Sequence, residues 1–232
     1  MGWLKKLFGK KETGLSEGDS LLIEAVTSHF ERHLGPLEDV FHELISPHVH
    51  IDVHHMPPTE ERPYHVLFTT GMAEKPMKGP EGNDWWEVML LLPPEWDPKK
   101  LWGDNVTEED FWPVRALKYV ARMPHAEGYW FPPFVSMPVS QDDTPYAGTQ
   151  FTGLLMVPAD MFPPEFAVLK MNDGRVIKIH IVMPLYQDEV EWKRVQKEPD
   201  ALWKLALGRG YEPMELLVCR TDRPNVLSGG GL

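Results

Sequence analysis

Cysteine, long apolar runs and basic side chains are all scarce in this chain. Cys219 is the only cysteine among 232 residues, which excludes an internal disulfide and a cysteine-rich zinc module and fits a reducing, cytoplasmic location. No apolar run approaches the roughly 20 residues that span a bilayer. The 23 basic side chains stand against 35 acidic ones, and the net charge of -12 predicts that the protein does not bind nucleic acid.

The chain also lacks the short motifs of common catalytic sites. It contains no G-x-S-x-G elbow, no P-loop and no dinucleotide-binding glycine pattern, and Gly208-Arg209-Gly210 is too short to be one. The run from Tyr64 to Trp96 holds two apolar stretches around a Gly/Asp loop, without a nucleophile or a paired acid and base. These absences favour a scaffold that binds a partner over an enzyme, and they predict no cofactor.

One globular α+β domain is expected at residues 15–224, because 42% of the residues are apolar and the length suits a single sizeable core. A flexible basic leader (1–14) and a flexible glycine-rich tail (225–232) are expected to flank it. On a helix, Trp3, Leu4, Leu7 and Phe8 would lie opposite the leader lysines, which is typical of a short interfacial membrane anchor. We favour a flexible leader, because so short a helix is marginal in water.

Hydrophobic periodicity predicts the elements of the first half. A helix is expected at 21–34, ended by Gly35-Pro36. Four strands with proline-rich turns between them, which indicate an antiparallel meander, are expected at 40–44, 48–55, 64–70 and 85–92. Thr107, followed by acidic residues, is typical of a helix N-cap, and this second helix is expected to end before Pro124.

The second half predicts a hairpin between further short elements. Its two arms, 166–171 and 175–183, flank the turn signal Asn172-Asp173-Gly174, and the β-branched second arm is expected to be a central strand. The other expected elements are strands at 134–139, 151–157 and 214–219 and helices at 187–197 and 199–207. The whole pattern predicts a mixed, largely antiparallel sheet packed with several flanking helices.

A set of short motifs in fixed order resembles the suppressor of fused (SUFU) domain family in its bacterial, single-domain form. The motif residues are Thr70, Gly71, Met72, Pro76, Glu87, Pro93, Trp112, Pro113, Pro184 and Leu185. The resemblance extends from about Leu22 to Pro224, and the order and spacing of the motifs make it specific.

The resemblance implies a single α+β domain without catalytic activity that acts by binding a protein. Eukaryotic members of the family hold a transcription factor in an inhibited complex, gripped between this domain and a second one. The resemblance to bacterial members further implies an immunity role, in which the protein neutralises a toxin. Because the sequence ends at Leu232 without that second domain, the eukaryotic partner class is not carried over.

A metal-dependent enzyme is the main alternative, motivated by the segment 48–55. On a strand, His48, His50, Asp52 and His54 would share one face, and imidazole and carboxylate groups are ligands for zinc or iron. A further ligand would have to come from another strand, with His65, His125 and His180 as candidates. We favour the simpler interpretation, a half-buried strand with a polar face exposed to water.

Two isolated reactive groups are expected to be structural. Glu87 stands among apolar neighbours, so burial would raise its pKa unless a cation or a hydrogen-bond donor meets it, and we expect such a structural partner. Cys219 lies in the apolar run 214–219, where a free cysteine is usually an inert small hydrophobe.

The predicted partner site is the aromatic segment around Tyr129, Trp130, Phe131 and Phe134. Its prolines keep it irregular, and exposed aromatic side chains are enriched at interfaces. The negative charge favours a basic protein partner, for which a toxin is the preferred hypothesis. A second alternative is an adaptor that attaches to a membrane through the basic leader.

Overall fold

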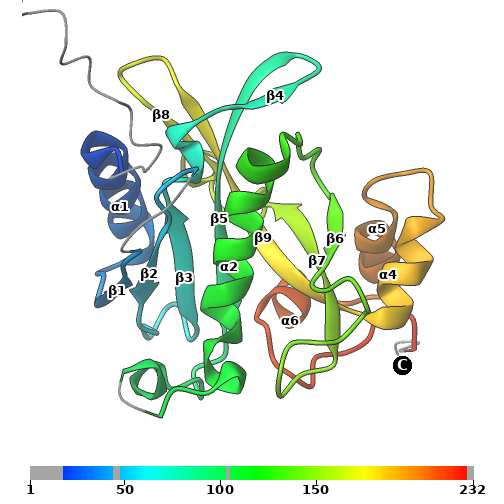
Figure 1. The fold of residues 1–232 in the computed structure, drawn as a ribbon. Helices are drawn as coiled ribbons and strands as arrows, with labels where there is room; N and C mark the ends of the chain where they lie inside the picture. The colour runs from blue at the N-terminus through cyan, green and yellow to red at the C-terminus, as the bar shows by residue number, and fades with distance from the viewer. Residues whose placement is uncertain (1–17, 44–47, 103–104, 229–232) are drawn as a thin grey trace, which may run out of the picture.

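One twisted sheet organises the chain in the computed structural model, which describes residues 18–43, 48–102 and 105–228 (Figure 1). Within these residues, nine mostly antiparallel strands run in the order β1-β2-β3-β5-β9-β7-β6, with β4 added to β5 and β8 added to β9. The strands are β1 (Asp39–Phe41), β2 (Asp52–Met56), β3 (His65–Thr70), β4 (Met77–Gly79), β5 (Gly82–Leu92), β6 (Ser136–Pro138), β7 (Phe151–Pro158), β8 (Val168–Lys170) and β9 (Val176–Tyr186). The predicted fold class, α+β with a mixed and largely antiparallel sheet, is confirmed.

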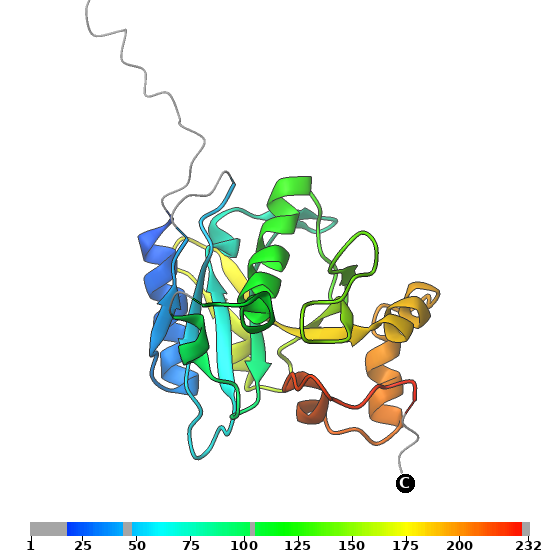
Figure 2. The same ribbon diagram turned by 60° about the horizontal axis from the view of Figure 1, so that its bottom comes forward.

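Helices cover both faces of the sheet. The long helix α2 (Glu108–Glu127) crosses the front face in Figure 1 and closes one apolar core. The helices that contribute to a second core on the opposite face are α1 (Ser20–Leu34), α3 (Pro164–Ala167), α4 (Gln187–Arg194), α5 (Ala201–Gly208) and α6 (Pro213–Leu217). Figure 2 shows the sheet between α2 and the helices of the second core. Two short 3₁₀ turns, η1 (Met72–Glu74) and η2 (Pro98–Leu101), complete the fold.

Side-chain caps fix the starts of the two longest helices. The Asp19 carboxylate accepts hydrogen bonds from the backbone N–H groups of Leu21 and Leu22 and so caps α1. Thr107 caps α2 in a reciprocal capping box with Asp110, as the sequence predicts. The expectation that α2 ends before Pro124 is wrong, because the helix continues to Glu127 and ends at Gly128 in the left-handed conformation. Pro124 has no N–H to donate, so its place in the last turn deprives α2 of one intrahelical hydrogen bond.

The predicted meander and hairpin are both confirmed. β1, β2, β3 and β5 pair antiparallel in succession, with Asp39 opposite His55 and Asp52 opposite Thr70. β8 and β9 form the hairpin around Gly174, which has a φ of 92°. β9 pairs with β5 in parallel and with β7 antiparallel, so it is the central strand that the sequence predicts.

Two sequence predictions about strands are wrong. β2 begins at Asp52 rather than at residue 48, and all five of its residues are buried, so it has no face exposed to water. Helices pack on both faces of the sheet, and the polar face of β2 is therefore covered as well. The expected last strand at 214–219 is mostly the helix α6, opened by Pro213 and a capping box between Glu212 and Glu215.

The predicted leader (1–14) lies outside the described residues. At the start of the predicted tail (225–232), the Val226 side chain is fully buried in the second core and the Leu227 N–H donates to Asn225. Among the described helices, none combines the length and the apolar character that a membrane span requires.

Candidate functional site

A buried carboxylate, Glu87 on β5, organises the turn that follows β3. One carboxylate oxygen accepts hydrogen bonds from the N–H groups of Gly71 (2.9 Å) and Ala73 (3.0 Å), and the other accepts from the Thr69 hydroxyl (2.6 Å). Burial raises the pKa of Glu87 to about 7 even though these donors lower it. The side chain is fully buried, and its partners are neutral donors rather than a cation.

Gly71 lets the turn η1 form against the neighbouring strand. Its φ is 106°, a left-handed value that side-chain-bearing residues rarely adopt. A Cβ atom at this position would lie 1.7 Å from the carbonyl oxygen of His50. Only glycine permits this approach, which directs the N–H groups of the turn toward Glu87.

The turn η1 also connects distant parts of the chain. The Met72 carbonyl hydrogen-bonds His125 in the last turn of α2 at 2.9 Å. The Ala73 carbonyl accepts from Arg175 of the β8–β9 hairpin, and Arg175 pairs with Asp19 at the start of α1. Glu87 therefore anchors a junction of both helical layers with the sheet.

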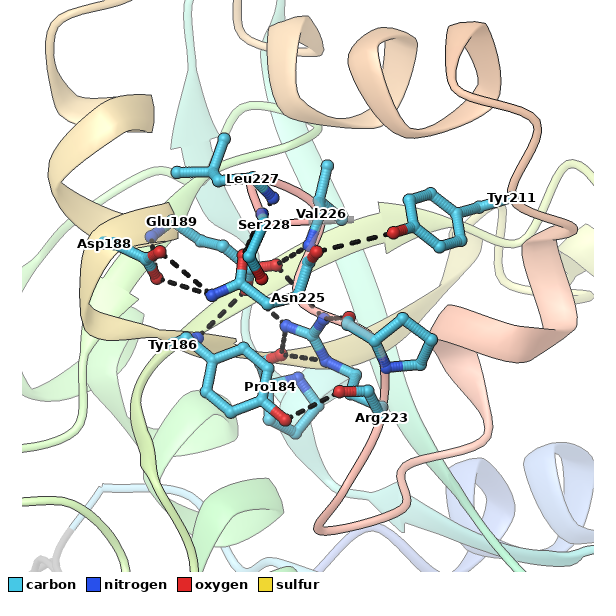
Figure 3. A network of polar contacts seen from close by, with 11 residues as sticks. Pro184, Tyr186, Asp188, Glu189, Tyr211, Arg223, Asn225, Val226, Leu227 and Ser228 are labelled. Carbon is cyan, nitrogen blue, oxygen red and sulfur yellow. Dashed lines mark hydrogen bonds and ion pairs between the residues drawn. The ribbon is translucent and has the colours of Figure 1, made fainter. Parts of the chain in front are cut away.

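A second buried carboxylate, Glu189 on α4, pairs with Arg223 near the end of the described chain (Figure 3). Both side chains are fully buried. The guanidinium also donates to the carbonyl of Pro184, at 3.0 Å from Nε and 2.6 Å from Nη2. Glu189 accepts further bonds from the N–H groups of Val226 (2.7 Å) and Tyr186 (3.0 Å), so the pair is satisfied on all sides.

This network fixes the C-terminal segment against β9 and α4. The Asn225 amide donates to both carboxylate oxygens of Asp188, and the Tyr186 hydroxyl donates to the Arg223 carbonyl at 2.7 Å (Figure 3). Arg223 and Asn225 carry no local sequence signal, because their partners lie 34 and 37 residues away. The family motif residues Pro184 and Leu185 belong to this network and to the core beside it.

The other motif residues serve packing and backbone geometry. Thr70 hydrogen-bonds His54 at 3.0 Å, and the Trp112 ring stacks on Tyr146 in the first core. Pro113 is buried inside α2, whereas Pro76 and Pro93 are partly exposed beside strand ends. These contacts stabilise the fold.

The residues of the predicted metal face are only partly brought together. His50 lies 3.1 Å from one Asp52 oxygen and His42 lies 3.0 Å from the other. His48 is exposed, and its carbonyl accepts from Lys75. His54 is turned toward Thr70 and stacks on Phe68, and burial lowers its pKa to about 4. A metal at these four residues stays the alternative hypothesis, and the absence of one stays the prediction.

The candidate third ligands lie elsewhere. His125 bonds the η1 turn, and His65 hydrogen-bonds His55 at 2.9 Å. His180 stacks on Trp86 with 3.5 Å between ring centroids, and burial lowers its pKa to about 3. Cys219 is buried, and desolvation raises the pKa of its thiol to about 12, which keeps the thiol protonated at neutral pH.

The predicted partner segment divides between core and surface. Phe131 is 4% exposed and packs near Trp86, so it belongs to the first core rather than to an interface. Tyr129 is 56% exposed, whereas Trp130 and Phe134 are partly buried. The Trp130 indole N–H donates to Asp84 at 3.2 Å, which attaches the segment to the β4–β5 hairpin.

A hollow of about 450 Å³ lies between this segment and the hairpin. It is lined by Gly79, Pro80, Glu81, Gly82, Asn83, Asp84, Trp130, Pro133 and Lys178. Lys178 pairs with Asp84 at 2.9 Å, whereas Glu81 at the rim has no ion pair among the residues that the structure describes. The hollow therefore combines an aromatic wall with a small negative excess.

Comparisons with known proteins agree with these motifs. The family described as suppressor of fused protein (SUFU) matches residues 47–223. Comparison with curated protein sequences gives no match. A suppressor of fused homologue from Neisseria gonorrhoeae has a similar structure, with a TM-score of 0.62 at 12% identity over 88% of this chain and 96% of the homologue.

Two further solved structures share the fold. The chain matched in the Sufu-Fu complex has a TM-score of 0.57 at 15% identity, covering 89% of this chain and 92% of that one. Drosophila Suppressor of Fused has a TM-score of 0.58 at 16% identity, covering 92% of this chain but only 53% of the Drosophila chain. The motifs, the fold and the extent of the family match lead to one conclusion: this chain belongs to the suppressor of fused family.

Proposed function

We propose that this protein binds another protein through the surface formed by Tyr129, Trp130 and the β4–β5 hairpin, and that it acts without catalysis. The exposed Tyr129, which directly precedes Trp130 of the hollow in the chain, carries the proposal. Large aromatic side chains at a concave surface supply contact area at low entropic cost. One relative was solved in a complex between Sufu and Fu, so protein binding has a precedent within the fold.

The burial and the hydrogen bonds of the two buried acids support a binding role over an enzymatic one. Glu87 and Glu189 are fully buried, and their oxygens accept hydrogen bonds from the protein itself. A general acid or base must reach a substrate. Neither carboxylate meets this requirement without local opening of the fold.

The partner we propose is a basic protein. The chain carries a net charge of -12, and Glu81 adds a negative charge at the rim of the hollow. A second hollow, along α2, is lined by Arg115, Lys118 and Arg122, and such a surface suits a basic partner less well. A toxin enzyme neutralised by an immunity-type protein is the partner class to test first.

Co-expression with the products of adjacent genes tests this function. A partner is expected to co-elute in a defined ratio and to bind in a calorimeter. Tyr129→Ala and the charge reversal Glu81→Lys are expected to weaken binding at least tenfold without changing the melting temperature. The matched control is Val195→Ala at an exposed position on the C-terminal side of α4. Unchanged affinity in both surface variants would refute the surface.

A further inference from the structure

The strands β1 and β2 form one edge of the sheet (Figure 1). One histidine and two acids come together at this strand pair. Asp39 of β1 lies directly opposite His55 of β2 in the antiparallel register. The neighbouring Glu38 donates its backbone N–H to the His55 carbonyl at 3.0 Å. Backbone pairing therefore fixes the three positions relative to one another.

The distances among these side chains suit a shared ligand better than direct hydrogen bonds. Nδ1 of His55 lies 3.6 Å from an Asp39 oxygen and 3.8 Å from a Glu38 oxygen. Both separations exceed a normal hydrogen bond. One donor atom from each of the three residues lies within 4.8 Å of the others, and among the described residues this is the one such group of three or more His, Cys, Asp or Glu.

The His55 ring is fully buried, and its Nδ1 atom has no hydrogen-bond partner within the described structure. Its other nitrogen, Nε2, hydrogen-bonds Nδ1 of His65 at 2.9 Å. An imidazole ring in its neutral form carries a single N–H. The position of that proton on each ring decides whether Nδ1 of His55 carries a hydrogen or a free lone pair.

The backbone of Pro94 determines which nitrogen of the neutral His65 ring carries the proton. His65 hydrogen-bonds the backbone of Pro94, which has a carbonyl but no N–H, so the single N–H of His65 is used there. Nδ1 of His65 then accepts from Nε2 of His55. Nδ1 of His55 is left with a bare lone pair that faces two carboxylates. These three electron-rich atoms repel one another, and a cation between them would offset that repulsion.

We propose that Glu38, Asp39 and His55 form a binding site for a divalent transition-metal ion of the zinc class. An imidazole nitrogen with two carboxylate oxygens suits zinc and its neighbours better than magnesium or calcium. Tetrahedral zinc with ligands at about 2.1 Å separates them by roughly 3.4 Å, close to the spacing here. The Glu38 and Asp39 side chains are 56% and 33% exposed, which gives the ion an entry path.

The surroundings resemble those of protein metal sites in one further respect. A ligating histidine usually donates its second ring N–H to a fixed acceptor, which orients the ring. Here His65 is that acceptor, and the Trp96 ring packs edge-on against both imidazoles. This site is distinct from the predicted face of His48, His50, Asp52 and His54, because His55 points to the other side of its strand.

Calorimetric titration of untagged, chelator-treated protein with ZnCl₂ tests the site. We expect one ion per chain, and we expect Glu38→Gln and Asp39→Asn each to weaken affinity at least tenfold. Both positions reach the surface, so the variants are expected to fold, which circular dichroism checks. Glu61→Gln, at another exposed acid, and His48→Ala are expected to bind like the unmodified protein.

Titration with Co²⁺ gives an independent readout, since its visible absorption reports on nitrogen and oxygen ligation. An absorption band that is present in the unmodified protein and lost in Asp39→Asn is expected. Absence of stoichiometric zinc binding would overturn the proposal. So would a zinc affinity in Glu38→Gln and Asp39→Asn equal to that of the unmodified protein. Loss of binding in His48→Ala alone would assign the ion to the other histidine face and equally refute this site.

Discussion

Replacing Glu87 with glutamine should remove a specific part of the protein's pH dependence. Burial raises the pKa of Glu87 from its ordinary value of 4.5 to about 7 in the folded state. Between these two values the carboxyl group is ionised in the unfolded chain and protonated in the folded one. The folded state therefore binds more protons, and the free energy of unfolding must fall as the pH rises through this window.

The size of the effect follows from the shift. Each pH unit within the window costs about 1.4 kcal/mol, so the whole window accounts for on the order of 3 kcal/mol. Glutamine has nearly the same shape but does not titrate. Glutamine can lower the stability by a constant amount through its contacts with Thr69, Gly71 and Ala73. It leaves the pH dependence that comes from the other groups unchanged.

Urea denaturation of both proteins at several pH values from 4 to 8 provides the assay. The stability of the unmodified protein minus that of Glu87→Gln is expected to decline by about 3 kcal/mol between pH 4.5 and 7 and to level off on either side. A difference that does not change with pH would refute the raised pKa. A difference that grows with pH would show that the N–H and hydroxyl donors outweigh burial.

Two further predictions concern the folded scaffold. Arg223→Ala leaves the buried Glu189 without its cation and should cost about 3–5 kcal/mol in urea denaturation, whereas Arg220→Ala, at a 51% exposed ion pair, should cost less than about 1 kcal/mol; equal costs would contradict the buried network. Gly71→Ala places a Cβ against the His50 carbonyl and should cost on the order of 3 kcal/mol, whereas Gly174→Ala, with a similar φ and open space, should cost about 1 kcal/mol by thermal melting. A similar cost at both glycines would show that the close approach is unimportant.

Local patterns predict much of this fold. The helix 21–34, the Thr107 cap, the four-strand meander and the Asn172-Asp173-Gly174 hairpin all follow from periodicity and turn chemistry. The errors arise where tertiary packing overrides a local pattern. Pro124 does not end α2, and Pro213 with its capping box makes a helix of an apolar run that reads as a strand.

The candidate sites depend more strongly on long-range pairing. The alternation of polar and apolar residues in 48–55 predicts a strand with a polar face. It does not predict that helices bury both faces of β2. The contact between Asp39 and His55 follows from the strand register, which no local motif specifies. Likewise, nothing near Arg223 indicates that it pairs with Glu189, and Phe131 resembles its exposed neighbour Tyr129 although it lies in the core.

Binding of a purified partner to the Tyr129 surface tests the central claim most directly. With the product of an adjacent gene that co-elutes with this protein, calorimetry should give saturable binding that weakens at least tenfold in Tyr129→Ala and is unchanged in Val195→Ala. A circular dichroism melt must show both variants folded. Full affinity in Tyr129→Ala would contradict the proposed partner surface.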